Sequence, residues 1–325
     1  MNFLQQLNRS LPTTIFLNVV FVSLWLLSAF WFETEKNSAE ITIFNSISLF
    51  SLPYFWGVIA QLICFVMLAL FVYKVIFLQY LSSITYLSFS VFMLFGVLFL
   101  ELHLFGNQTF ATIFFVLALW QGSKTDTRQD NKLVLLNTFL LLILSVSFVP
   151  EFIYFTPIFI FGFFYFIEFN IKSLMVIIFS ISMPILCALG LCFLFDRIDV
   201  FNNFFNELFD LKFEINRIVF EIDSVIPEVI SLILTLISLF IFLRQMKIYK
   251  MYVRRFTFFC LILWLSTIFF IVFLQNDILY FIWVYIILTT FFITLSFNNL
   301  QPKRRKKVKN QKRRKFRKLK NLKVV

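Results

Sequence analysis

The sequence has little glycine, proline, histidine or charge. Its 325 residues include 6 glycines, 7 prolines and 1 histidine, and charged residues make up 14%, against about 25% in soluble proteins. A single histidine excludes by count any site that needs several imidazoles, such as the two-histidine zinc motif. The sequence also has no glycine-rich phosphate loop and no dinucleotide fingerprint, so nothing in it indicates ATP-driven transport by this chain alone.

Cysteine is scarce too, and its placement argues against a disulfide framework. The four cysteines lie inside apolar runs and include no C-x-x-C pair: Cys64, Cys187, Cys192 and Cys260. Disulfide-rich scaffolds are small secreted domains with many regularly spaced cysteines. We therefore expect four reduced thiols in a membrane core.

Apolar residues make up 61% of the chain, and phenylalanine alone supplies 51 residues. An apolar segment of about 20 residues can cross a bilayer as a helix, because a helix satisfies its own backbone hydrogen bonds. The sequence predicts an all-α transmembrane bundle of about ten spans, packed through phenylalanine, leucine and isoleucine. The expected spans are 12–32, 54–73, 84–100, 108–121, 133–149, 152–167, 173–195, 227–243, 256–274 and 278–297.

The charges between these segments predict an orientation. If both termini are cytoplasmic, the inner loops and the N-terminus carry eleven Lys or Arg residues, and the outer loops carry four. Three acids fall inside, Asp126, Asp130 and Glu168, and the other fourteen fall outside. Cytoplasmic loops of membrane proteins are enriched in Lys and Arg. We therefore expect a bacterial inner-membrane protein with both termini in the cytoplasm.

Residues 196–226 keep an apolar stripe although they are too polar to cross a membrane. Its members recur three or four residues apart, which is typical of an amphipathic helix: Phe201, Phe204, Leu208, Leu211, Ile215, Ile218 and Ile222. The other face is acidic, which argues against anchoring by anionic lipid. We expect a helix that lies on the outer surface of the bilayer or caps the bundle from that side, with a gating element or lid over a cavity as the alternative.

The tail at 298–325 cannot form a core. Between Lys303 and Lys323 it holds 14 Lys or Arg residues and no acid, a composition typical of disorder. The bundle would thus end near residue 297, and the tail would bind anionic lipid headgroups of the cytoplasmic leaflet. Ribosomal RNA, or no partner beyond fixing the topology, are the alternatives, and nucleic acid is the less favoured partner.

Four ionisable residues form the candidate site. Glu33 and Glu35 follow the first span directly, and Glu101 and His103 follow the third span on the same side of the membrane. Together they could hold a divalent cation or act as a general base toward a substrate at the outer face. The alternative is structural, because outer loops are acidic when bases are excluded from them. Two polar residues inside spans, Asn18 and Gln61, are expected to form interhelical hydrogen bonds.

Two resemblances bear on function. Three apolar runs in 110–194 resemble an uncharacterised multi-pass inner-membrane family of Bacteroidota, namely FATIFFVLALWQ, LLNTFLLLILSVSFVPEFIYFTPIFIFGFFYF and FNIKSLMVIIFSISMPIL. The order of a first span, an acidic outer loop and a tight second and third span is similar to C-type glycosyltransferases, which use polyprenyl-phosphate sugars. That likeness implies that Glu33 or Glu35 is a base or metal ligand, although the pair contains no Asp.

The function expected from these observations is cell-envelope biogenesis at the outer face, with a polyprenyl-linked substrate. A non-catalytic membrane scaffold and a secondary transporter are the alternatives. An ion-coupled transporter needs ionisable groups near the bilayer midplane, and the expected spans contain almost none.

Overall fold

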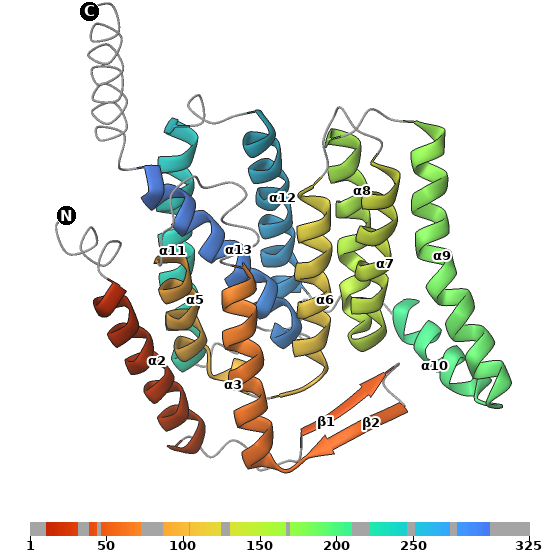
Figure 1. Cartoon of the computed structure of the whole chain (residues 1–325), viewed down its shortest axis with the longest axis horizontal. Helices are drawn as coiled ribbons and strands as arrows, with labels where there is room; N and C mark the ends of the chain where they lie inside the picture. The colour runs from red at the N-terminus through yellow and green to blue at the C-terminus, as the bar shows by residue number, and fades with distance from the viewer. Residues whose placement is uncertain are drawn as a thin grey trace, which may run out of the picture.

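In the computed structural model the chain forms a bundle of antiparallel helices (Figure 1). The structure describes residues 11–31, 39–43, 47–72, 87–103, 105–124, 131–166, 170–209, 222–245, 251–273 and 278–299. Within these ranges it contains eleven α-helices, two short 3₁₀ helices and one two-stranded β-hairpin.

Ten of the α-helices coincide with the ten predicted apolar segments. They are α2 (Leu11–Trp31), α3 (Tyr54–Phe71), α5 (Leu87–Leu98), α6 (Asn107–Gly122), α7 (Lys132–Phe148), α8 (Phe155–Phe166), α9 (Ile171–Leu194), α11 (Ile222–Gln245), α12 (Met251–Phe273) and α13 (Ile278–Asn299). Three stretches of the described chain are long and apolar enough to cross a membrane, namely Tyr54–Phe71, Ile171–Leu194 and Val253–Val272. The chain is therefore a helical membrane protein.

Local chemistry explains where several helices begin and end. The side chain of Asn170 accepts a hydrogen bond of 3.1 Å from the backbone N–H of Lys172, which caps the start of α9. At the end of α9, Asp196 adopts a φ of 50°, a left-handed conformation that Asp tolerates better than most residues. Pro150 ends α7, because the residue before a proline is pushed into extended conformation, as Val149 is.

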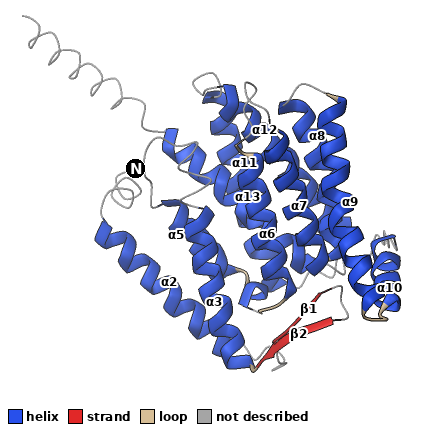
Figure 2. Cartoon of the chain, turned by 45° about the vertical axis from the view of Figure 1, so that its right-hand side comes forward, coloured by secondary structure: helices blue, strands red, loops and turns tan. Residues whose placement is uncertain are grey.

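The prediction of a purely α-helical chain is wrong at one place. Residues 39–52, expected to be part of an outer loop, contain strands β1 (Ala39–Ile43) and β2 (Ile47–Leu52), which pair antiparallel with an irregularity between Ile41 and Thr42. The β-branched residues of these strands favour extended backbone. Figure 2 shows the hairpin in red across one end of the bundle, which we call the hairpin end.

The predicted amphipathic segment is only partly helix. Helix α10 (Ile198–Phe209) covers its first part, residues 210–221 lie outside the described ranges, and α11 already begins at Ile222. Val200 and Phe204 of α10 are buried, Asn202, Asn203 and Asn206 are exposed, and the helix packs against α9 and the 3₁₀ helix η3 (Pro150–Tyr154). The described part is therefore amphipathic and packs at the hairpin end (Figure 1).

Helix α13 lies at the centre of the bundle. The apolar pattern of the sequence did not distinguish it from the other helices. All residues from Phe281 to Ser296 are buried, with α11, α12, α5 and α6 packed around the helix. Hydroxyl groups join it to its neighbours. The hydroxyls of Ser231 and Tyr285 lie 2.8 Å apart, and Trp264 Nε1 donates to Thr289 Oγ1 at 3.2 Å. The bundle is thus built around its last helix.

The thiols and the aromatic side chains follow the sequence predictions. All four cysteines are free, as predicted. Phenylalanine fills the core, for example where the ring of Phe115 lies 4.9 Å from that of Phe155 and 5.6 Å from that of Phe159. The first pair is tilted and the second is edge-to-face, and edge-to-face pairs are favourable beyond the area they bury.

Candidate functional site

Among the residues that the structure describes, acids and bases lie mostly at opposite ends of the bundle. The acids of the described ranges belong to segments at the hairpin end: Glu40, Glu101, Glu151, Asp196, Asp199, Glu207, Asp223 and Glu228. Six of the seven described Lys and Arg residues belong to the opposite end: Lys124, Lys132, Lys172, Arg244, Arg254 and Arg255. The seventh, Arg197, is the exception and lies between Leu194 and Ile198, at the hairpin end (Figure 1).

The chain reaches the hairpin end from several directions. Helix α2 ends at Trp31, and the segment with Glu33 and Glu35 follows. Helix α5 descends to the same end and continues into the 3₁₀ helix η2 (Leu100–His103), which contains Glu101 and His103. Helix η2 contacts α2, α3, α5 and α13. These contacts place the turn with Glu101 and His103 at the end of the molecule where α2 also ends.

His103 is buried at this end, with 6% of its surface exposed. Its ring meets that of Trp25 edge-on, with centroids 4.0 Å apart. Burial lowers the pKa of His103 to about 4, although a hydrogen bond to the Gly96 backbone acts in the opposite direction. Its Nε2 atom has no hydrogen-bond partner among the described residues. At neutral pH His103 is therefore an uncharged side chain fixed against Trp25.

Gln61 of α3 fixes the position of η2. Its Nε2 donates to the backbone carbonyl of Leu102 at 2.6 Å, and its Oε1 accepts from Thr109 Oγ1 at 2.8 Å. Gln61 and Thr109 are almost completely buried, where a hydrogen bond is costly to lose. The prediction that Gln61 bonds between helices is confirmed, and the bond holds the turn that contains Glu101 and His103.

A second pair of hydrogen bonds attaches the hairpin to the bundle. The backbone N–H of Thr42 donates to Asn107 Oδ1 at 2.8 Å, and Asn107 Nδ2 donates to Thr42 Oγ1 at 2.7 Å. Asn107 is the first residue of α6, two residues before Thr109. Sequence reasoning missed both residues. One sequence signal could have indicated Asn107, namely the three polar residues from Asn107 to Thr109 at the start of an otherwise apolar helix.

The structure thus describes only part of the predicted four-residue site. Glu33 and Glu35 lie outside the described residues, and the side chain of Glu101 does as well, although its backbone is part of η2. His103 lies in the core. The described residues contain no group of three or more His, Cys, Asp or Glu side chains close enough to hold a metal ion.

Comparisons with protein-family models, with curated proteins and with solved structures found no match for this chain.

Proposed function

We propose that all ten apolar helices, α2, α3, α5 to α9 and α11 to α13, cross a bacterial inner membrane with both termini in the cytoplasm. The hairpin end then faces outward. The separation of acids from bases along the described helices supports this orientation, because Lys and Arg are retained on the cytoplasmic side. Helices α5 and α8 are short, at 12 residues each, so in this proposal the membrane-crossing segments are the longer apolar runs 84–100 and 152–167, which leave His103 outside the span.

Reporter fusions would test this topology. We expect fusions after Glu40 and Asn206 to report the outer side, and fusions after Gly122 and Val325 to report the cytoplasm. Glu40 and Asn206 belong to segments at the hairpin end, Gly122 ends α6 at the opposite end, and Val325 follows α13 in the sequence. Alkaline phosphatase is active outside and a fluorescent protein inside. A cytoplasmic signal at Asn206 would contradict the orientation of the second half of the chain.

We further propose that the hairpin end acts on a polyprenyl-linked sugar in cell-envelope biogenesis, as a C-type glycosyltransferase-like enzyme. Glu33, Glu35 and Glu101 are the acids of the site. One carboxylate takes the proton of an acceptor hydroxyl, whose oxygen then attacks the anomeric carbon while the bond to the lipid phosphate breaks. A divalent cation held by the other carboxylates would balance the charge of the departing phosphate.

In this proposal His103 is a positioning residue. It is buried and uncharged at neutral pH, and it lies two residues after Glu101 on a turn that Gln61 holds by hydrogen bond. The hydrogen bond to Leu102 and the contact of His103 with Trp25 hold the backbone of this turn, and a general base or metal ligand requires such a fixed support. The observation that carries the proposal is this fixed turn at the acidic end of the bundle.

Paired substitution of the two acids would test the enzymatic role. In a strain that depends on this gene, we expect Glu33→Gln with Glu35→Gln to abolish envelope glycoconjugate synthesis while the protein level in the membrane stays unchanged. Asp199→Asn is the matched control, because it removes an exposed acid of α10 at the same end. Full synthesis in the double variant would overturn the enzymatic role and favour the scaffold.

The transporter has less support than the enzyme. The described acids and bases lie at or near helix ends, whereas ion-coupled transporters place such groups near the bilayer midplane. The basic tail, whose residues 300–325 lie outside the described ranges, binds anionic headgroups of the cytoplasmic leaflet in this proposal. Each base near such a surface contributes about 1 kcal/mol.

A further inference from the structure

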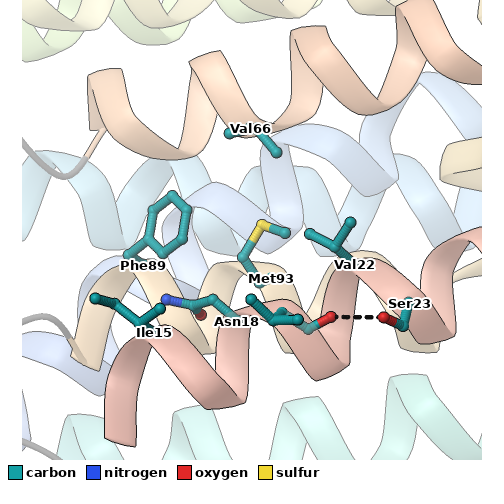
Figure 3. Close-up of a pocket in the computed structure, with 8 residues that line it drawn as sticks. Ile15, Asn18, Val22, Ser23, Val66, Phe89 and Met93 are labelled. Atoms are coloured by element: carbon teal, nitrogen blue, oxygen red, sulfur yellow. Dashed lines mark hydrogen bonds between the residues drawn. The ribbon is translucent and has the colours of Figure 1, made fainter. Parts of the chain in front are cut away.

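A groove opens between α2, α3 and α5, far from the proposed chemistry at the hairpin end. It has a volume of about 320 Å³, near the lower end of small-molecule sites, which span about 300–1,000 Å³. Figure 3 shows Asn18 of α2 on one side of the groove, with Phe89 and Met93 of α5 and Val66 of α3 opposite. Its lining is almost wholly apolar and is completed by Ile15, Val19 and Val22 of α2.

Asn18 is the exception to this apolar lining. Its Oδ1 atom is buried and has no hydrogen-bond partner among the described residues, so within this part of the chain that atom does not form the interhelical hydrogen bond expected of Asn18. The other polar side chain of the lining, Ser23, is satisfied by its own helix, because its hydroxyl donates to the Val19 carbonyl at 2.9 Å. The groove therefore presents a single free acceptor to whatever fills it.

The chemistry of the groove argues for its occupant. An ordered water would need two to four polar partners, and Asn18 is the one polar side chain of the lining that its own helix does not satisfy. An extended hydrocarbon chain fits, and Ile15 and Val19, which are 54% and 58% exposed, leave the groove open toward the surrounding bilayer.

We propose that this groove binds the acyl chain of a membrane lipid that carries a hydroxyl group, with the hydroxyl donating to Asn18 Oδ1. Asn18 lies seven residues, or about 10 Å, from the start of α2. The hydroxyl therefore meets Asn18 about a third of the way along α2, and the chain lies along Phe89, Met93 and Val22. The inference rests on the groove and not on the enzymatic proposal.

Native mass spectrometry of the purified full chain would test the site. The probes are 1-monopalmitoylglycerol, methyl 3-hydroxypalmitate and methyl palmitate, which share one chain length and differ in their hydroxyls. We expect at least one hydroxylated probe to bind about tenfold more tightly than methyl palmitate. The first probe carries its hydroxyls on glycerol, and the second carries its hydroxyl on the acyl chain. The difference in their binding shows which of these two hydroxyl positions the groove accepts.

Three variants separate the groove from the rest of the surface. Asn18→Leu should bring the hydroxylated probe to the level of methyl palmitate, because the acceptor is lost. Val22→Phe should remove binding of all three probes by filling the groove, and Val20→Phe, on the same helix but outside the lining, should leave binding unchanged. An unchanged melting temperature verifies that each variant is folded.

Two results would overturn the proposal. The first is equal binding of hydroxylated and plain probes by the unmodified chain, or a preference that survives Asn18→Leu. The second is a dimer of the unmodified chain that Val22→Phe separates, since the groove would then be a contact between two copies.

Discussion

Alanine in place of Gly162 is expected to lower the free energy of unfolding by about 1–3 kcal/mol, the usual cost of overpacking a core. A Cβ atom at this position of α8 would lie 2.3 Å from Cδ2 and 2.4 Å from Cε2 of Phe259 on α12. The ring of Phe259 cannot move away easily, because it is 4% exposed and its centroid lies 5.3 Å from that of Phe159. Helices α8 and α12 must therefore separate.

Gly190→Ala is the matched control. Gly190 also lies in a long apolar helix, α9, but a Cβ atom there would meet nothing within 4 Å. Alanine is the better helix former by up to about 1 kcal/mol, so this variant should be as stable as the parent or slightly more so. Tryptophan fluorescence during heating in detergent measures both. Equal melting temperatures for the two variants would contradict the close approach of α8 and α12.

The stability of the protein should also fall as the pH is lowered from about 6.5 to about 4, through His103. In the unfolded chain histidine has a pKa of about 6.5, and in the folded chain burial lowers the pKa of His103 to about 4. Between these values the unfolded state binds a proton that the folded state does not, so the stabilisation present above pH 6.5 is lost as the pH falls. At about 1.4 kcal/mol per pH unit, the loss reaches about 3 kcal/mol.

The variant His103→Gln isolates this contribution. Glutamine keeps an N–H donor for the Gly96 backbone but does not titrate, and the chain contains no other histidine. Melting temperatures measured across this pH range should therefore fall less steeply for the variant than for the parent. Carboxylates that titrate near pH 4 affect both proteins alike. Parallel curves would show that His103 takes up a proton without cost, and so is not buried.

The helices were predictable because the information for them is local. Each of the ten apolar runs became a helix with ends within about five residues of the predicted ones, as in 108–121 against Asn107–Gly122. A continuous apolar segment has few ways to satisfy its backbone, and the helix is the simplest. The β-hairpin was not predictable in this way. Its strands are short, and the bonds that fix Thr42 come from Asn107, 65 residues away.

The candidate site was predictable only as a location. Charge placement indicated that Glu101 and His103 lie at the same end as the segment after α2, and the structure agrees for the described residues. Nothing in the neighbouring sequence shows that His103 is buried against Trp25, because Trp25 belongs to a helix nearly eighty residues earlier. Asn18 and Gln61 show the same limit of the sequence, since both are amides in apolar helices. Gln61 forms a hydrogen bond to another segment, whereas the Oδ1 atom of Asn18 has no partner among the described residues.

Hydrophobicity and charge act residue by residue along the chain, so the membrane class, the positions of the helices and the separation of charge all follow from the order of the amino acids. The tertiary structure decided which helix is central, which polar side chains are satisfied and where the groove lies. These properties depend on which surfaces meet. These properties arise only when residues far apart in the sequence, such as Gly162 and Phe259 or Gln61 and Thr109, pack within a few ångströms of each other.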